Sequence, residues 1–213
     1  MKYDTRIENL TVGQYQDLYK IHTSQDDDID KAIASVSILT GLPRWDVEEL
    51  PMPEFTAMSR EISVLFSNPV VKEKVVKSVK VNGKKYSVIL DPKKLCAGQY
   101  IDLQHFLKQN MVENIHKLMA CIIVPAKRWP WDDKPKYDGE NHEKIAEGIQ
   151  NLSYIEIYST CLFFSKLWNS SIKAIGTYLI REMNKEMKRK NQNPIVTEMD
   201  LWNYLAGSTM LSR

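Results

Sequence analysis

The sequence predicts a mainly α-helical protein, a helical bundle of two related halves with an inserted β-hairpin. Apolar residues recur at helical spacing between capping residues along most of the chain. One short stretch instead alternates apolar and polar residues around Asn82-Gly83. A nine-residue pattern also occurs twice. The expected segments are a first helical half over 1–70, the hairpin over 71–92, a second helical half over 93–168 with a Trp-containing loop at 125–141, and a C-terminal helical extension over 169–213.

The composition is that of a folded domain with a core of its own. The chain has 213 residues, 43% hydrophobic and 26% charged, which excludes disorder as its main state. No stretch approaches the roughly 20 apolar residues of a membrane span, and no signal peptide is recognisable, so we expect an intracellular protein without membrane contact. The cysteines, Cys96, Cys121 and Cys161, form no Cys-x-x-Cys pair and are expected to be reduced core residues.

The first half shows clear helix boundaries. Thr11 is placed to cap a helix over 12–22. Three aspartates at 26–28 open a second helix, which Gly41 ends, because acidic side chains suit the positive end of a helix dipole. A short turn over 45–50 and a third helix over about 54–67 follow.

The alternating stretch from Lys74 predicts a hairpin with a two-residue Asn-Gly loop. In that register Val79 faces Tyr86, and Lys80 stands directly across from Lys85 on the polar face. Like charges in this position are unfavourable, which fits either an acidic partner or a solvated edge. Lys77, Lys80 and Lys85 are therefore candidate interaction residues.

The second half is expected to be helical again, with helices over about 97–109, 111–121, 142–149, 153–168, 170–190 and 198–206. The loop between 125 and 141 is long for a compact domain and contains Trp129 and Trp131. Exposed tryptophans are enriched in protein interfaces, so Trp129 and Trp131 are candidate interaction residues. The two side chains can instead close the loop over its own core. Both interpretations stay open.

The repeated pattern is L-x-x-G-Q-Y-x-D-L, at 10–18 and at 95–103, with six identities in nine positions. A phosphate-binding loop would need further glycines and a Lys-Ser/Thr pair, which are missing. We interpret the pattern as a helix start, in which Thr11 caps the helix and Gly13 allows another helix to approach closely. Tyr15 and Leu18 then face the core. Its recurrence indicates two related helical halves.

No catalytic, cofactor-binding or metal-ligating residue is predicted from the sequence. The four histidines lie far apart, and neither His-Glu-x-x-His nor Gly-x-Ser-x-Gly occurs. Asn141-His142-Glu143 with Asp138 matches no established ligand spacing and is interpreted as a polar helix start. An enzyme whose site is assembled only by folding stays an alternative.

Charge is distributed unevenly. Residues 1–60 hold eleven acidic and six basic side chains, whereas 72–94 hold eight lysines against two acids. Such opposite surfaces suit contacts between copies of the chain. The C-terminal helix, with Lys188 and Arg189, is basic and suits either nucleic acid or an acidic subunit, or else is a solvated helix face.

Two segments carry a family resemblance. Residues 39–43 (LTGLP), with 46–51 and Glu54-Phe55, look like a helical segment of tail-assembly chaperones of long-tailed bacteriophages. Residues 94–103, with the preceding Val-Asn-Gly-Lys hairpin and 137–142 (YDGENH), resemble small morphogenesis and virion proteins of phages that infect gut Bacteroidales, including the crAss-like group.

The resemblance implies a non-enzymatic structural component of a tailed phage virion, in a portal, neck or tail ring or as packaged cargo. Its expected partners are other phage structural proteins and copies of itself, with nucleic acid as a further contact of the C-terminal helix. It would be assembled in the host cytoplasm and reside in the virion. The alternative is a tail-assembly chaperone that is not retained in the particle.

Overall fold

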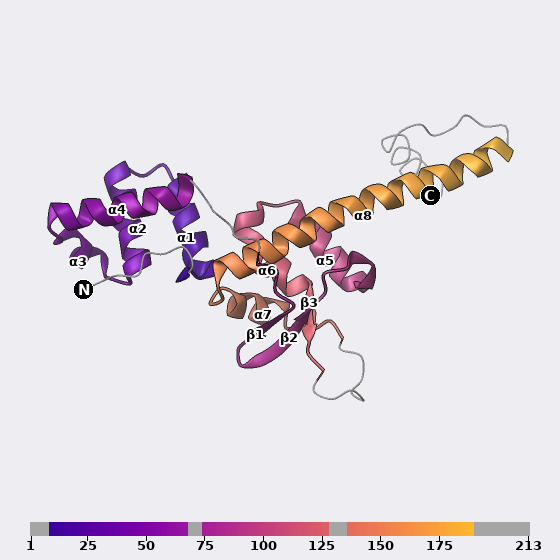
Figure 1. Cartoon of the computed structure of the whole chain (residues 1–213), viewed down its shortest axis with the longest axis horizontal. Helices are drawn as coiled ribbons and strands as arrows, with labels where there is room; N and C mark the ends of the chain where they lie inside the picture. Colours follow the sequence, from indigo (N-terminus) through magenta and orange to yellow (C-terminus); the bar gives the residue numbers. More distant parts are fainter. Residues whose placement is uncertain (1–8, 68–73, 128–135, 190–213) are drawn as a thin grey trace, which may run out of the picture. The chain divides into compact units, whose positions relative to one another are not determined.

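The computed structural model describes residues 9–67, 74–127 and 136–189, which are mainly helical with one small antiparallel sheet (Figure 1). The chain divides into two units, Met1–Phe164 and Ser165–Arg213. The described elements are α1 (Val12–Thr23), α2 (Asp28–Thr40), α3 (Arg44–Glu48), α4 (Met52–Ser67), β1 (Ser78–Val81), β2 (Lys84–Val88), the 3₁₀ helix η2 (Pro92–Lys94), α5 (Ala97–Leu107), α6 (Met111–Cys121), β3 (Ile123–Pro125), α7 (His142–Ile149) and α8 (Tyr154–Arg189).

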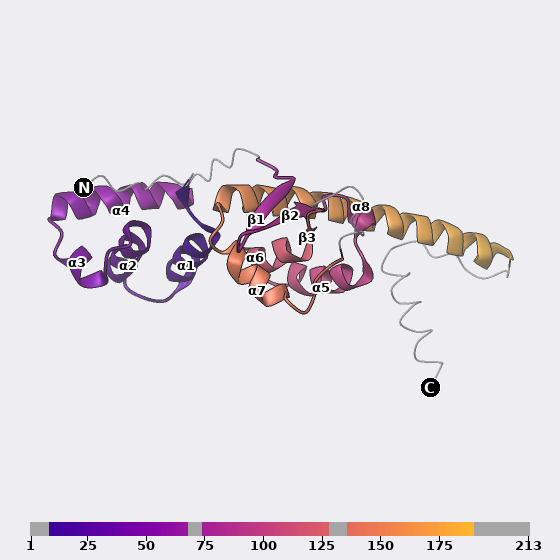
Figure 2. The same cartoon turned by 90° about the horizontal axis from the view of Figure 1, so that it is seen from below.

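The expected boundaries of the first helices are confirmed. Thr11 Oγ1 accepts from the Gln14 backbone N at 3.2 Å, and Gln14 Oε1 accepts from the Thr11 N at 3.0 Å, which completes a capping box. α2 ends at Gly41 in the left-handed conformation, with φ of 71°. In Figure 2, α4 crosses α2, which is seen nearly end-on. Val36, Val47 and Ile62 form a buried cluster between α2, α3 and α4.

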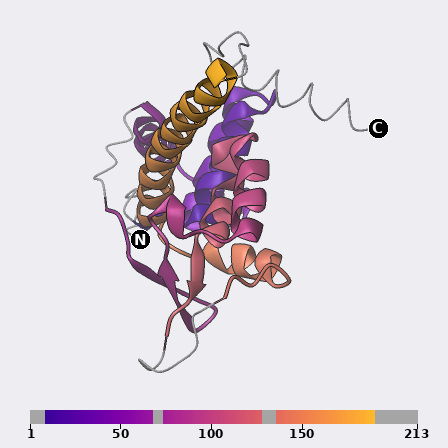
Figure 3. The same ribbon diagram turned by 90° about the vertical axis from the view of Figure 1, so that its right-hand side faces the viewer.

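The hairpin has the predicted register, with Val79 opposite Tyr86 and Lys80 opposite Lys85. The sheet nevertheless has three strands, because β3 pairs with β2 on the other side (Figure 3). β3 was not predicted: a short apolar run directly after a helix has no periodicity that distinguishes a strand from a last helical turn.

The central part of the first unit is the segment formed by α6 and β3. Residues 118–124 are all buried, and α5 and α7 pack on α6. The chain before α8 is fixed to the start of α1, because Val12 N donates to Leu152 O at 2.9 Å and Tyr154 N donates to Leu10 O at 2.8 Å. α1 also packs on α6, where Gln16 contacts His116, 100 residues further along the chain.

The two copies of the repeated pattern begin α1 and α5, and they share one contact pattern. Gln14 caps its own helix and donates to Ile38 O near the end of α2, at 3.3 Å. Gln99 accepts from Cys96 N and donates to Cys121 O at the end of α6, at 2.7 Å. The elements after each helix pair differ, since α3 and α4 follow the first and β3 and α7 follow the second.

Two expectations for single elements are wrong. The helices expected at 153–168 and 170–190 are one helix, α8, because the stretch around Ser170 contains neither Pro nor Gly. Ser170 Oγ donates to Lys166 O at 2.9 Å within α8 and so does not begin a new helix. Cys96 is exposed at the N-cap of α5, whereas Cys121 and Cys161 are buried, and all three are free thiols. The helix expected at 198–206 lies outside the described residues.

Candidate protein-interaction surfaces

The hairpin presents four exposed lysines, which we call the hairpin lysines: Lys77, Lys80, Lys84 and Lys85. Lys80 and Lys85 are cross-strand neighbours on the face away from Val79 and Tyr86, as the sequence predicted. Within the described part of the chain, none of the four forms an ion pair. Facing like charges cost a few tenths of a kcal/mol up to about 1 kcal/mol, so this surface is left electrostatically unsatisfied.

A second charged surface surrounds the N-terminus of α2. Asp27 is the N-cap of this helix, but its side chain makes no capping hydrogen bond, and Asp28 begins the helix. Both residues are exposed and form no ion pair with a described residue. Asp30, the third residue of α2, pairs with Arg44 at the start of α3. We call Asp27 and Asp28 the α2 acidic pair.

Large apolar side chains are exposed on the same group of helices. Ile29, Trp45 and Met52 are 65%, 67% and 70% exposed. Ile29 and Trp45 each adjoin a member of the Asp30–Arg44 ion pair in sequence. Trp45 was not predicted as a contact residue, although its spacing from Val47 in the sequence could have indicated its exposure. Residues two apart on a helix point to opposite sides, so burial of Val47 in this five-residue helix turns Trp45 outward.

The other predicted contact residues are not described as side chains. Trp129 and Trp131 lie in 128–135, outside the described residues. Lys188 and Arg189 belong to the last turn of α8, and their side chains are likewise outside the description. The two ends of the Trp-containing loop are fixed, because Ala126 N donates to Lys85 O at 2.9 Å and the Tyr137 hydroxyl donates to Asp102 at 2.7 Å.

Folding also assembles a buried group of titratable side chains between α5, α6 and α7. Cys121 Sγ lies 3.4 Å from His142 Nε2, and the His142 ring stacks on Phe106. Burial raises the pKa of the Cys121 thiol to about 12, and the charge of Asp102 adds to this, while a hydrogen bond from Tyr137 opposes it. The thiol is therefore protonated at neutral pH, and in this conformation it holds helices together and is not activated as a nucleophile.

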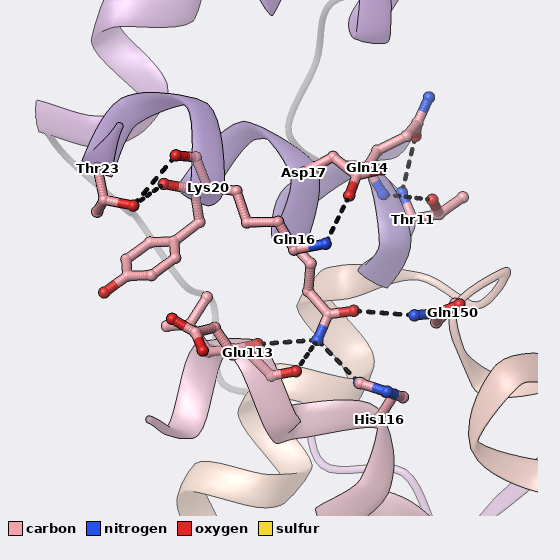
Figure 4. A network of polar contacts seen from close by, with 11 residues as sticks. Thr11, Gln14, Gln16, Asp17, Lys20, Thr23, Glu113, His116 and Gln150 are labelled. Atoms are coloured by element: carbon pink, nitrogen blue, oxygen red, sulfur yellow. Dashed lines mark hydrogen bonds and ion pairs between the residues drawn. The ribbon is translucent and has the colours of Figure 1, made fainter. Parts of the chain in front are cut away.

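A polar network joins α1 to α6 and to the end of α7 (Figure 4). Gln16, 3% exposed, donates through Nε2 to the backbone oxygens of Val112 and Glu113 and contacts His116 Nδ1 at 2.8 Å. Gln150 Nε2 reaches Gln16 Oε1 at 3.4 Å. The two hydrogens of this amide are shared among the three acceptors. Because an amide nitrogen does not accept, the contact with His116 requires an unprotonated Nδ1, so the neutral imidazole carries its proton on Nε2.

The described residues contain a pocket of about 360 Å³ between α2 and α4, lined by Ser35, Ser59 and Lys31 among others. Ser59 Oγ is buried there without a hydrogen-bond partner. Over the described ranges, no group of three or more His, Cys, Asp or Glu side chains is placed to bind a metal ion. None of the helices in those ranges is long and apolar enough to cross a membrane.

The comparisons with protein families, curated proteins and solved structures gave no match to this chain.

Proposed function

We propose that this protein is a non-enzymatic structural component of a tailed bacteriophage virion and acts through protein–protein contacts. The observation that carries the contact role is the exposure of Ile29, Trp45 and Met52 on one group of packed helices. The resemblance of residues 39–43, 46–51 and 54–55 to tail-assembly chaperones supports the phage setting, as does that of 94–103, the Val-Asn-Gly-Lys hairpin and 137–142 to small virion proteins.

The exposed apolar side chains are large enough to matter for binding. Trp45 leaves two thirds of its surface exposed, and covering it would bury roughly 100–170 Å² of a tryptophan's total. At about 25 cal/mol per Å² this contributes about 2–4 kcal/mol to an interface, before the entropic cost of association. Large aromatic side chains of this kind dominate interface energies.

The proposed location is a portal, neck or tail ring, or the packaged cargo, after assembly in the host cytoplasm. The partners are other phage structural proteins and copies of the same chain. The basic end of α8, with Lys188 and Arg189, supports nucleic acid as a further contact, since clustered basic residues bind phosphates.

Mass spectrometry of purified mature particles of the encoding phage tests this function. We expect the chain at a fixed copy number relative to the major capsid protein, and a multiple of six or twelve would indicate a ring. Absence from particles together with abundance in infected cells contradicts the virion role and supports the tail-assembly chaperone.

A variant of the same experiment tests the surface. Trp45→Ala with Met52→Ala should lower incorporation into particles, because the apolar contact area is removed. Glu49→Ala with Glu54→Ala changes two exposed polar residues of the same elements and should leave incorporation unchanged. Equal incorporation of both variants would exclude this surface from assembly.

We also propose that the helix pairs α1–α2 and α5–α6 derive from one repeated unit, which gives the two related halves. The equivalent contacts of Gln14 and Gln99 support this, because each glutamine joins the start of one helix to the end of the next. The surroundings of the repeated tyrosines have diverged: Tyr15 stacks on Tyr154 with ring centroids 3.7 Å apart, whereas Tyr100 is 39% exposed.

A further inference from the structure

We infer that this chain binds a second copy of itself head to tail, with the hairpin lysines of one copy on the α2 acidic pair of the next. The inference rests on the proposed function only in assigning the chain a contact role.

Each surface lacks counter-charges of its own among the residues that the structure describes. Lys80 and Lys85 face each other across the hairpin, and no described acidic side chain pairs with them. Asp27 and Asp28 are consecutive exposed carboxylates without a basic partner among the described residues. Each surface therefore gains from a partner that carries the opposite charge.

The hairpin lysines and the α2 acidic pair of one chain do not pair with each other. The hairpin packs on α7 and β3, whereas α2 packs on α1, α3 and α4. None of the ion pairs recorded between described residues joins the hairpin to α2. Neutralisation of both surfaces therefore needs another molecule.

A second copy of the chain fits both surfaces better than nucleic acid does. The whole chain carries 29 basic and 27 acidic residues, so two opposite surfaces are present on a nearly neutral protein. Nucleic acid would neutralise the hairpin lysines and be repelled by the α2 acidic pair. A second copy neutralises both surfaces. Repulsion between like charges disfavours orientations that place two basic or two acidic surfaces together.

The surroundings of the acidic pair provide an apolar contact for the incoming lysines. Trp45 is exposed on α3, and α3 is joined to the first turn of α2 through the Arg44–Asp30 ion pair. Lysine side chains pack their methylene groups on aromatic rings and place the ammonium over the ring face. An interface between two different surfaces is heterologous, so its repetition gives a closed ring or an open filament.

The experiment uses the full-length chain in sedimentation velocity, over a concentration series at about 0.05 M and about 0.5 M salt. We expect concentration-dependent association that high salt reverses. Lys80→Glu with Lys85→Glu, and separately Asp27→Lys with Asp28→Lys, should each abolish association. Lys93→Glu with Lys94→Glu makes the same charge change on η2 and should leave association intact.

Mixing the two non-associating variants makes the test specific. The unchanged acidic pair of the first variant fits the unchanged lysines of the second, and the two reversed surfaces fit each other. The equimolar mixture should therefore associate although neither component does, a result that misfolded variants cannot give. Circular dichroism melting of each variant confirms its folded state.

Three results would overturn the inference: a wild-type chain that stays monomeric at low salt, a Lys80→Glu/Lys85→Glu variant that associates like wild type, or a mixture that stays monomeric.

Loss of DNA binding by the Lys80→Glu/Lys85→Glu variant, with a monomeric wild type, would assign the hairpin lysines to nucleic acid instead. A chain that self-associates but is absent from particles contradicts only the virion role. A chain present in particles but monomeric alone contradicts only the self-contact.

Discussion

Single residues determine how closely the elements of the first unit approach one another. Gly148 of α7 lies against the hairpin: a Cβ at this position would be 2.5 Å from Val81 Cγ1 and 2.7 Å from Asn82 Nδ2. The Asn82 side chain can turn away, but Val81 is buried and its branched side chain is rigid. Glycine is therefore required here by space, whereas Gly83, with φ of 79°, is required by the turn conformation.

Gly148→Ala should lower the free energy of unfolding by about 1–3 kcal/mol, because the added methyl group displaces Val81. Gly98→Ala, in the first turn of α5, meets only Tyr137 at 3.6 Å and should raise stability by about 0.4–1 kcal/mol. Urea denaturation of both variants measures the two effects. A Gly148→Ala protein as stable as wild type would show that the hairpin can move away from α7.

The two repeated glutamines allow a paired comparison. Gln99 is 2% exposed, and Gln99→Leu leaves Cys121 O and Cys96 N without their partner. We expect a loss of about 1–3 kcal/mol. Gln14→Leu removes the equivalent contacts at a half-buried position and should cost about 1 kcal/mol, because water replaces part of them. Chemical denaturation that ranks the variants in the opposite order would contradict this account of the repeat.

The pairing of β1 with β2 is weakened because Lys80 and Lys85 face each other and repel. Lys85→Glu creates an opposite-charge pair across the strands and should raise the free energy of unfolding by a few tenths of a kcal/mol up to about 1 kcal/mol. Lys84→Glu makes the same charge change opposite Val81 and should give no such gain. Thermal melting at low salt distinguishes the two variants, and equal melting temperatures would show that Lys80 does not interact across the strands.

At the scale of the whole first unit, the contact between α1 and α6 depends on a neutral imidazole. Burial lowers the pKa of His116 to about 4, and the charge of Lys117 adds to this. Protonation at Nδ1 would place a donor against the Gln16 amide, which is itself a donor. The network is therefore compatible only with neutral His116.

This lowered pKa makes stability pH-dependent. In the unfolded chain His116 is protonated below about pH 6.5, whereas in the folded chain it is protonated only below about pH 4. The stabilisation is fully present above pH 6.5 and is lost as the pH falls towards 4, by about 1–2 kcal/mol after allowance for solvent screening of the half-buried ring. Urea denaturation between pH 4.5 and 7 measures this slope.

His116→Asn should flatten the slope, because asparagine does not titrate. His105→Asn removes an imidazole from the exposed side of α5 and should leave the slope as in wild type. A His116→Asn variant with the full wild-type slope would assign the acid sensitivity to other groups.

The local features of this protein follow from residues that are neighbours in the sequence. Thr11 and Gly41 mark helix ends, and Asn82-Gly83 sets the hairpin register, because capping and turn conformations depend on neighbouring residues alone. The candidate pair Lys80 and Lys85 followed from that register. Alternation also predicted correctly that Val79 and Tyr86 are buried.

Other features depend on contacts between residues that are far apart in the chain. β3 is a strand because it pairs with the edge of β2. Ser170 lies within α8, where its hydroxyl donates to the backbone oxygen of Lys166 in the preceding turn. His142 is buried against Cys121 although its sequence neighbours are polar. Trp45 is exposed because Val47 occupies the core side of α3. Burial and long-range pairing arise from packing between elements, which periodicity along one chain does not encode.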